Sequence, residues 1–460
     1  MVSITHFLEN KMNNDTQKLS VKEKIGYGLG DTASNFYWQM FMNFILFFYT
    51  DVFGISAAAA GTMLLITRIW DTGIDPIMGV IADRTNTKWG KFRPYLLWMA
   101  LPIGIIGVLT FTTPNLSESG KIVYAYITST LMMAAYTAIN TPYSALMGVL
   151  TPNSLERTSV SSYRFVLAFV AIFLVQGTTL PLVKFFGKGD QAVGFQWTMV
   201  VFSIVAVFLF VLTFLNTRER VHPPKDQKTS IKNDLGDLLH NKPWIVLFFI
   251  GIFALSYNSI RSGSMIYYFK YYVGDEILTS AFMVSGTIAA IAGVMITKFL
   301  SKLLGKRTLY MILWLTVSVI TSAFYFVPKE NIVLIFAFNI LISFILGPTA
   351  PLIWAMYADT ADYSEWKTGR RATGLVFSAA TFAQKLGWAF GGALTGWLLA
   401  YFGFVANVVQ SQGAQDGIRF MMSVIPAAAG ILTAIAVWFY TLDEPMMEKI
   451  EQDLSARKKE

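Results

Sequence analysis

The stretch Arg68-Ile-Trp-Asp71-Thr-Gly-Ile-Asp75-Pro-Ile-Met-Gly79 decides how this sequence folds. It lies within an apolar run, residues 61–80, and about 20 such residues are enough to cross a bilayer as a helix. Each charged side chain in such a run costs on the order of 2.5–3.5 kcal/mol on insertion scales. Arg68, Asp71 and Asp75 share one helical face because they are spaced three and four residues apart. These side chains must therefore face protein or a water-filled cavity, not lipid.

The composition is that of a polytopic membrane protein. The chain has 460 residues, of which 54% are hydrophobic and only 14% are charged, whereas soluble domains carry about 25% charged residues. The net charge of +8 does not indicate nucleic-acid binding, because the Lys and Arg residues cluster in loops between apolar runs. The chain contains no Cys, which excludes disulfides.

Motifs for catalysis are missing from the sequence. The three histidines, His6, His222 and His240, lie in or beside polar segments, so none is placed as an intramembrane proton relay or metal ligand. Ser-His-Asp hydrolysis and a catalytic metal site therefore have no candidate residues, and there is no P-loop for ATP-driven transport. We predict that the protein is not an enzyme and that it uses no cofactor other than a coupling ion.

Runs long enough to span a membrane occur six times on each side of a polar centre. They are Ile25–Tyr49, Gly61–Ile81, Tyr95–Thr112, Ile122–Val149, Tyr163–Phe186, Phe195–Leu215, Trp244–Val273, Ser280–Leu300, Leu309–Val327, Ile332–Tyr357, Thr373–Phe402 and Gly417–Tyr440. This pattern predicts an all-α protein of twelve transmembrane helices in two six-helix bundles. The predicted domains are 1–215 with the cation site, a central loop 216–243, a second bundle 244–442 and a tail 443–460.

The distribution of basic residues predicts the orientation. Lys and Arg concentrate in the termini, the central loop and alternate short loops, which the positive-inside rule places in the cytoplasm. Both termini are then cytoplasmic, as an even number of spans requires. The halves also repeat a Gly-Lys turn after their second span, at Gly90-Lys91 and Gly305-Lys306. Repeated six-helix halves are typical of transporters whose substrate site lies near the bilayer midplane.

An ordered set of motifs resembles a known family. The motifs are Tyr27-Gly-Leu-Gly-Asp31, Phe48-Tyr-Thr-Asp51-Val-Phe-Gly54, Arg68 to Pro76, Arg84 to Pro94, Tyr136-Thr-Ala-Ile-Asn140-Thr-Pro-Tyr143 and Ala358-Asp-Thr-Ala-Asp362-Tyr-Ser-Glu365-Trp366. Over nearly its whole length the chain resembles the glycoside–pentoside–hexuronide:cation symporters of the major facilitator superfamily, typified by the melibiose permease. Its N-terminal stretch looks most like xyloside and glucuronide carriers. The resemblance implies the major facilitator fold in a bacterial inner membrane.

The resemblance also implies a cation site. In this family the paired carboxylates of the second helix bind the cation, and they fall on Asp71 and Asp75. A threonine of the fourth helix contributes and falls on Thr137, and a lysine of the eleventh helix lies near and falls on Lys385.

For the sugar site the resemblance implies an arginine at Arg164. The chain departs from the melibiose permease where that protein has sugar-site aspartates, because Asn35 and Asn140 stand there. It departs again at Ile74, where relatives often have Asn. Since one candidate Na⁺ ligand is thereby absent, we expect coupling to H⁺.

The chemistry of the two carboxylates agrees with a cation site. Asp71 and Asp75 are one helical turn apart, which puts their side-chain bases about 5–6 Å from each other. Na⁺ would bind oxygen ligands there, and a proton would serve as well because like charges raise one pKa. The alternative is a structural ion pair with Arg68 or Lys385. In the functional interpretation, Arg68 and Lys385 couple binding of the cation to binding of the sugar.

Polar and aromatic residues in other spans predict the sugar site. Asp31 and Asn35 are four residues apart and can face one cavity, although Asp31 is also suited to pair with a base in a gate. Arg261 interrupts the seventh span, either to pair with a first-half carboxylate such as Asp31 or to bind a substrate carboxylate. The predicted substrate-binding set is Asp31, Asn35, Asn140, Arg164, Arg261, Trp354 and Thr381.

Charged cytoplasmic loops of the two halves form a candidate gate. Acids and bases alternate in both halves, so pairs that are individually weak can act together. The alternative is positive-inside topology alone, which explains the bases but not the acids. The predicted gate residues are Asp83, Arg84, Arg157, Asp359, Asp362, Glu365, Arg370 and Arg371.

The main functional hypothesis is sugar:cation symport by alternating access, driven by H⁺ or Na⁺. A lysophospholipid carrier of the same fold and a sugar sensor without transport are the alternatives. The polar residues of the predicted cavity favour sugar over lipid. Glycines 387, 391, 392 and 396 of the eleventh span favour closely packed helices that slide, and hence a transporter. The expected partners are a small sugar or glycoside and the lipid bilayer, with no nucleic acid, and the monomer is the expected functional unit.

Overall fold

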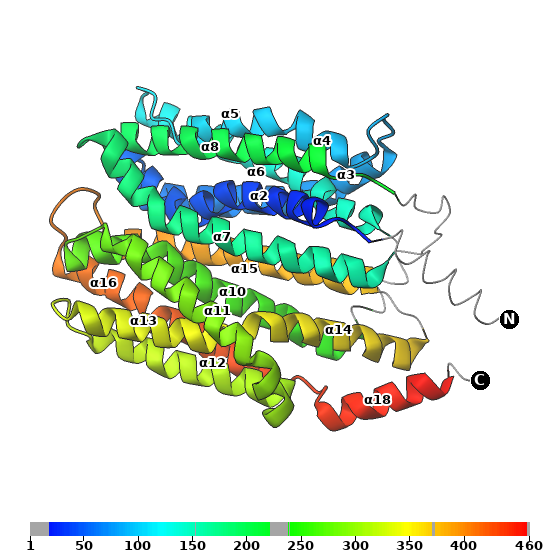
Figure 1. Ribbon diagram of the computed structural model, residues 1–460. Coiled ribbons are helices and arrows are strands. Elements are labelled where there is room, and N and C mark those ends of the chain that lie inside the picture. The colour runs from blue at the N-terminus through cyan, green and yellow to red at the C-terminus, as the bar shows by residue number, and fades with distance from the viewer. Residues whose placement is uncertain (1–17, 152, 221–237, 239, 370–372, 458–460) are drawn as a thin grey trace. The chain divides into compact units, whose positions relative to one another are not determined.

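The computed structural model describes residues 18–151, 153–220, 238, 240–369 and 373–457, and these form helices joined by short loops (Figure 1). In this described part, eight helices are long and apolar enough to cross a membrane. The prediction of an all-α polytopic membrane protein is confirmed. Every predicted run coincides with one helix or with a helix broken in two.

The chain divides into two compact units. One contains Met1–Phe41 and Trp70–Gln227, and the other contains Met42–Ile69 and Lys228–Glu460. The second unit therefore takes in a segment, residues 42–69, that belongs by sequence to the first half. The helix boundaries, by contrast, follow the predicted spans closely.

In the first unit, helices α2 and α3 each contribute one part, and five helices lie wholly within it. The bounds are α2 Val21–Phe47, α3 Ala57–Arg84, α4 Arg93–Trp98, α5 Ala100–Thr110, α6 Glu118–Leu150, α7 Ser154–Gly187 and α8 Gln191–Asn216. The predicted third span is broken between α4 and α5 at Met99.

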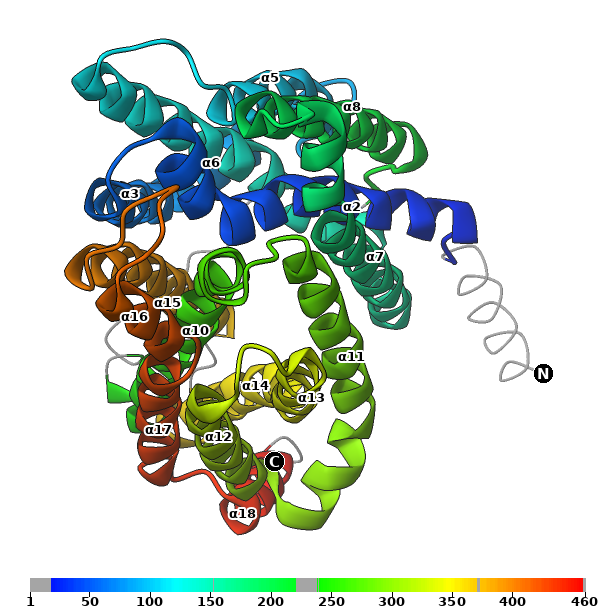
Figure 2. The same cartoon turned by 90° about the vertical axis from the view of Figure 1, so that its left-hand side faces the viewer.

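The second unit holds the end of α2, the start of α3 and the following helices. They are η1 Phe48–Phe53, α10 Lys242–Tyr267, η2 Tyr268–Val273, α11 Leu278–Leu304, α12 Lys306–Ala323, η3 Phe324–Phe326, α13 Ile332–Leu346, α14 Thr349–Thr368, α15 Thr373–Tyr401, α16 Gln412–Met422, α17 Val424–Trp438 and α18 Glu444–Arg457. Figure 2 shows α12, α13 and α14 beside one another, with α17 next to α12. The predicted charged tail forms α18.

Polar residues at the loop ends determine where several helices begin. The side chains of Asp190, Asn241, Asn331 and Ser411 accept hydrogen bonds from the first backbone N–H groups of α8, α10, α13 and α16. Such caps satisfy donors that have no partner within the helix. These caps therefore help to determine the residue at which each of these apolar helices begins.

The repeated Gly-Lys turn is capped in the same way in both units. Gly90 and Gly305 both have positive φ, at 108° and 77°, which favours glycine. The Glu219 carboxylate accepts from the backbone N–H groups of residues 91, 92 and 93 at 2.7–2.9 Å. The Glu444 carboxylate accepts from the N–H of Lys306. Each acid thus follows the sixth predicted span of its half and caps the third, as an internal repeat requires.

Glycines of α15 allow close packing against α10 in the second unit. A Cβ on Gly387 would lie 2.6 Å from the carbonyl oxygen of Ile252, and a Cβ on Gly391 would overlap Ser259. The predicted close packing at these glycines is confirmed. On another face of α10, Tyr257 packs edge-on against Trp314 at 5.3 Å and bonds the Thr321 hydroxyl at 2.6 Å.

We predict that Glu219→Ala and Glu444→Ala each lower the stability of the protein. Each change leaves the N-terminus of a helix without a charge-assisted hydrogen-bond acceptor, which is worth about 1–3 kcal/mol. The measurement is the thermal unfolding midpoint in detergent. Glu448→Ala, at an exposed position of α18, is the matched control, and equal midpoints for all three variants would contradict the capping role.

Candidate transport site

The carboxylates of Asp71 and Asp75 meet one hydroxyl group in the first unit. The Thr137 Oγ1 of α6 lies 2.6 Å from Asp71 Oδ1 and 3.2 Å from Asp75 Oδ1. Asp71 and Thr137 are buried, at 1% and 2% exposure, and Asp75 is half-buried. The three residues therefore form a compact oxygen cluster within the part of the protein that the sequence predicts to lie in the membrane.

Proline interrupts the hydrogen-bond ladder of α3 beside this cluster. Pro76 follows Asp75 directly within the helix and has no N–H to donate to the carbonyl four residues earlier. A proline also stands inside α6 at Pro142, five residues after Thr137. Backbone irregularity of this kind in a membrane helix is tolerated where neighbouring groups or a cavity satisfy the freed groups.

A second polar cluster joins α2 to α7 in the first unit. The Arg164 Nε donates to Asp31 Oδ2 at 2.8 Å. Asn35 Nδ2 donates to the carbonyl oxygen of Asp31 at 2.9 Å and lies 3.5 Å from its Oδ1. The predicted sugar residues Asp31, Asn35 and Arg164 are thus brought together. Asp31 has an ion-pair partner within its own unit.

The Tyr27-Gly-Leu-Gly-Asp31 motif positions this cluster. A Cβ on Gly28 would lie 2.7 Å from Leu167, and a Cβ on Gly30 would lie 2.5 Å from the ring of Tyr143. Tyr27 stacks on Tyr143 at 4.6 Å, and each hydroxyl bonds the other residue's backbone carbonyl. The glycines therefore let α2 approach α6 and α7 closely enough for Asp31 to reach Arg164. The guanidinium also lies over the Tyr143 ring at 5.4 Å.

Asn140 extends the polar face of α6 beyond Thr137. Its Nδ2 lies 3.4 Å from the Tyr136 hydroxyl, and its Oδ1 is a buried acceptor with no hydrogen-bond donor among the described residues. Trp38 stacks on Tyr136 at 5.3 Å. A buried amide oxygen without a donor is costly in a low-dielectric environment, so a ligand hydroxyl would be stabilised there.

Arg261 in the second unit has an amide where a carboxylate would be expected. It is 4% exposed, and its Nη2 donates to Asn339 Oδ1 at 3.1 Å. The guanidinium lies over the Phe282 ring at 5.8 Å, and its Nε has no acceptor among the described residues. Asn339 is held by the Phe282 carbonyl at 2.7 Å. Asn339 was not predicted, and its signal in the sequence is an amide inside an apolar run.

The remaining predicted sugar and coupling residues lie on several helices. Trp354 of α14 is 39% exposed and stacks on Phe377 at 5.9 Å. Thr381 is exposed and bonds the carbonyl of its own helix at Phe377. Lys385 of α15 is half-buried. Arg68 is buried in the second unit, with its Nη2 3.2 Å from the sulfur of Met42.

The predicted gate residues occupy varied environments. Asp83 and Arg84 are exposed, while Arg157, Asp362 and Glu365 are half-buried. Asp359 is buried and forms an ion pair with Lys306 of its own unit. Arg370 and Arg371 lie outside the described residues. The gate assignment stays a prediction.

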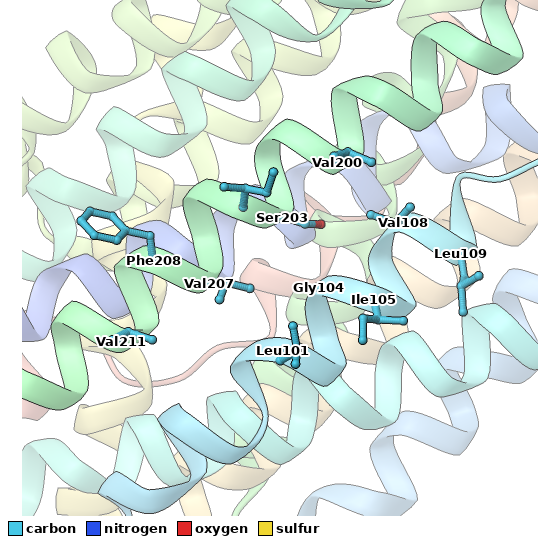
Figure 3. A pocket seen from close by; sticks show the side chains of 11 residues that line it. Leu101, Gly104, Ile105, Val108, Leu109, Val200, Ser203, Val207, Phe208 and Val211 are labelled. Carbon is cyan, nitrogen blue, oxygen red and sulfur yellow. The ribbon is translucent and has the colours of Figure 1, made fainter.

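An apolar groove between α5 and α8 is unsuited to a sugar. It has a volume of about 600 Å³, and Figure 3 shows aliphatic side chains such as Leu101, Ile105 and Val207 lining it. Polar groups near its floor are limited to hydroxyls such as that of Ser203. Across the described ranges, no group of three or more His, Cys, Asp or Glu side chains could hold a metal ion. The candidate site residues are therefore the polar clusters of α2, α3, α6 and α7 in the first unit and, separately, the Arg261 cluster of α10 in the second.

Comparison with known proteins agrees with this arrangement. A family model described as "MFS/sugar transport protein" matches residues 26–444. The chain belongs to this family. As an MFS sugar transporter it is a multi-pass membrane protein, and the family consists of transporters, not enzymes.

Relatives of this MFS sugar transporter have been described in several bacteria. It is 39% identical to the inner membrane symporter YicJ of Escherichia coli K12 over 96% of this chain and 97% of that protein. It is 36% identical to the isoprimeverose transporter of Lactiplantibacillus pentosus (94% and 91%) and 31% identical to the glucuronide carrier protein homolog of E. coli K12 (96% and 97%). The predicted family, its sugar symport function and its place in the inner membrane are confirmed.

Solved structures show the same fold at low sequence identity. The crystal structure of a D-xylose-proton symporter matches with a TM-score of 0.65 and 13% identity, over 92% of this chain and 98% of that one. The nucleoside transporter NupG matches with a TM-score of 0.60 and 14% identity, over 91% and 99%. Such likeness establishes the major facilitator fold for this MFS sugar transporter.

We predict that Asp71→Asn and Asp75→Asn each abolish uphill accumulation of sugar. One remaining carboxylate beside Thr137 would not bind and release the coupling ion, so the coupling free energy, typically about 1–3 kcal/mol, would be lost. The measurement is concentrative uptake in energised cells. Asp275→Asn, at an exposed position of the second unit, is the control, and normal accumulation by both site variants would exclude the carboxylates from coupling.

Proposed function

We propose that the protein couples the uptake of a glycoside to the entry of one proton at the Asp71–Thr137–Asp75 cluster. The observation that carries this proposal is the pair of distances from one hydroxyl to two carboxylates, 2.6 and 3.2 Å. A hydroxyl has one hydrogen and donates to one acceptor at a time. A proton on the other carboxylate would let that carboxyl group donate to the hydroxyl oxygen.

One proton completes this hydrogen-bond chain. Asp75 as a neutral acid would donate to Thr137, and Thr137 would donate to ionised Asp71. Without that proton both carboxylates are charged one helical turn apart, and their mutual repulsion favours binding of a cation. Na⁺ would instead need several oxygen ligands, and Ile74 offers none at the position where relatives often have Asn. Lys385 keeps the coupling role that the resemblance implies, and Arg68 keeps the coupling role predicted from its position on α3.

The second polar cluster supports a sugar as the substrate. Asp31, Asn35 and Arg164 offer acceptors and donors to sugar hydroxyls, and the free Oδ1 acceptor of Asn140 lies one turn from Thr137 on α6. A substrate that bonds Asn140 would stiffen the helix that carries the coupling hydroxyl. Proton binding and sugar binding would thus both act on α6, so each would change the affinity for the other. The acyl chain of a lysophospholipid would leave the Asn140 acceptor without a donor.

The topology belongs to the same proposal. We place twelve spans across the membrane, in bundles of residues 1–215 and 244–442 joined by a cytoplasmic loop, with both termini in the cytoplasm and alternating access as the transport mechanism. The basic loops and the repeated capped turns at Gly90 and Gly305 support this arrangement. The functional unit in the proposal is the monomer.

A carboxylated glycoside is the second candidate for the substrate class, and Arg261 favours it. Its guanidinium is buried, and its one hydrogen-bond partner among the described residues is the Asn339 amide oxygen. A buried cation is strongly stabilised by a carboxylate, which a glucuronide would bring and a xyloside would not.

We predict that Asn339→Asp separates these substrate classes. The new carboxylate would pair with Arg261 from within the protein, so binding of acidic glycosides should weaken by about 2 kcal/mol or more while xyloside binding is retained. The measurement is counterflow with radiolabelled xylosides and glucuronides, with Asn216→Asp, on α8 of the first unit, as the control. An equal loss of counterflow for xylosides and glucuronides would show that Arg261 does not distinguish substrates by their charge.

For the coupling ion, we predict that substrate addition alkalinises a lightly buffered suspension of energy-depleted cells without added Na⁺. Sugar enters with a proton, so the medium loses protons, and the signal should vanish in Asp71→Asn and in the presence of a protonophore. Accumulation that survives the protonophore but requires a Na⁺ gradient would contradict proton coupling.

A further inference from the structure

Two helices in the second unit end in the same unusual way. After α2, the π-helical turn η1 is closed by Gly54 with φ of 81°, and after α10 the turn η2 is closed by Gly274 with φ of 95°. The sequences correspond position by position, as Phe48-Tyr-Thr-Asp-Val-Phe-Gly54 and Tyr268-Phe-Lys-Tyr-Tyr-Val-Gly274. Each lies at the end of the first span of its half. π-turns are rare and often mark functional sites.

The backbone hydrogen bonds of the two turns also correspond. The carbonyl of Tyr49 accepts from the N–H groups of Gly54 and Ile55, and the carbonyl of Phe269 accepts from those of Gly274 and Asp275. Because the two turns stand at equivalent places in the internal repeat, they form a matched pair of helix ends. This symmetry was not visible in the sequence, where the motifs share few side chains.

The two turns contact each other through a charge pair of a buried carboxylate and a half-buried lysine. Lys270 Nζ lies 2.8 Å from Asp51 Oδ1, and the Asp51 side chain has 0% exposure. The Tyr271 hydroxyl donates to the same carboxylate oxygen. A further hydrogen bond joins the same two segments. The hydroxyl of Thr50, in η1, lies 2.8 Å from the hydroxyl of Tyr267, the last residue of α10.

A third segment, the loop between α15 and α16, completes the cluster through Asn407. Its backbone is left-handed, with φ of 59°, which asparagine tolerates better than most residues. Asn407 Oδ1 accepts from Lys270 at 2.8 Å, its Nδ2 donates to the carbonyl of Asp51 at 2.6 Å, and its N–H donates to the Tyr271 hydroxyl at 2.8 Å. Asp51, Lys270, Tyr271 and Asn407 are called the latch below.

The start of α3 contacts α15 nearby without side chains in between. A Cβ on Gly396 would lie 2.5 Å from the carbonyl oxygen of Ala57, and a Cβ on Gly61 would lie 2.8 Å from that of Ala393. Trp397 Nε1 donates to the Thr62 hydroxyl at 3.0 Å. Residues 42–69 are therefore bound to the second half by the latch and by a close helix crossing.

The latch lies at one end of the second unit. It is formed where α10 ends and where the loop after α15 turns, whereas α18 and the capped turn at Gly305 lie at the other end (Figure 1). The sequence predicts the C-terminal end to be cytoplasmic, which puts the latch on the outer side of the membrane.

We propose that the latch holds the outer side of the transporter closed, and that the Asp51–Lys270 pair must break before a substrate can enter from outside. The proposal rests on the proposed function, since it presupposes a transport cycle. Residues 42–69 belong to the first half by sequence and are fastened here to the second. A transporter with alternating access must release such a fastening once in each cycle, and a charge pair that is either formed or broken gives it two discrete states.

Removal of the latch cation tests this directly. The natural chain has no Cys, so Leu64→Cys, at a position on α3 that is 6% exposed, introduces a single reporter thiol. We expect Lys270→Ala to raise the rate of its alkylation by a membrane-impermeant maleimide at least fivefold from the outside, while Lys270→Arg leaves the rate near that of the parent. Lys329→Ala, an exposed cation beside Tyr272, is the matched control.

A second variant in the same assay checks that the Leu64→Cys reporter responds when α3 and α15 separate. Gly396→Val should separate α3 from α15 by steric overlap and raise the labelling without touching the latch. An unchanged rate in folded Lys270→Ala protein overturns the proposal, and a rise with Gly396→Val alone would assign closure to the helix crossing. Because labelling needs neither sugar nor ion, its outcome is independent of whether proton coupling is correct.

A cross-link supplies the opposite test. Thr50→Cys with Tyr267→Cys creates the only two thiols in the chain, at positions whose native hydroxyls lie 2.8 Å apart. Because a cysteine is much shorter than a tyrosine, the two thiols are joined by a short bifunctional methanethiosulfonate and not by a direct disulfide. Cross-linking should stop sugar uptake, and a reductant should restore it to the level of the untreated double variant. Full uptake by the cross-linked protein would overturn the proposal, because a latch that never opens could not then support transport.

Discussion

One hydroxyl between two carboxylates constrains the rest of this protein. Thr137 Oγ1 lies within hydrogen-bond reach of Asp71 and Asp75, on spans that the sequence predicts. Two like charges at that separation repel each other in a low dielectric. In the proposed function a bound proton relieves this repulsion, and a sugar that alters the position of α6 alters the affinity for that proton.

Buried charge elsewhere follows the same constraint, with different partners. Asp31 is neutralised by Arg164, and Asp51 by Lys270, each at 2.8 Å. Arg261 bonds an amide instead. Because breaking such a pair is costly, the Asp51–Lys270 pair is suited to holding one state of the proposed cycle until it opens. The amide-bound arginine is suited to an exchangeable anion.

The sequence predicts those features of this protein that carry a large free-energy cost in a membrane. Asp71 and Asp75 stand out because charges inside an apolar run are expensive, and the spans follow from the lengths of those runs. Asp51 and Lys270 were not predicted as a pair, because they lie at the ends of runs, where charges are ordinary, and 219 residues apart. Asn339 and Glu219 were also missed, since their roles depend on helix packing that no local pattern encodes. Membership of residues 42–69 in the second unit depends on the conformation of the transporter, which composition does not record.

The central claim is that sugar binding and protonation of the Asp71–Thr137–Asp75 cluster are linked. The most direct measurement is calorimetric titration of the purified protein with its glycoside at alkaline pH, in buffers of different ionisation enthalpy. The dependence of the observed heat on the buffer gives the number of protons taken up with the sugar. We predict net proton uptake by the parent protein and none by the Asp71→Asn, Asp75→Asn double variant. Sugar binding without proton uptake, or uptake that persists in the double variant, would contradict it.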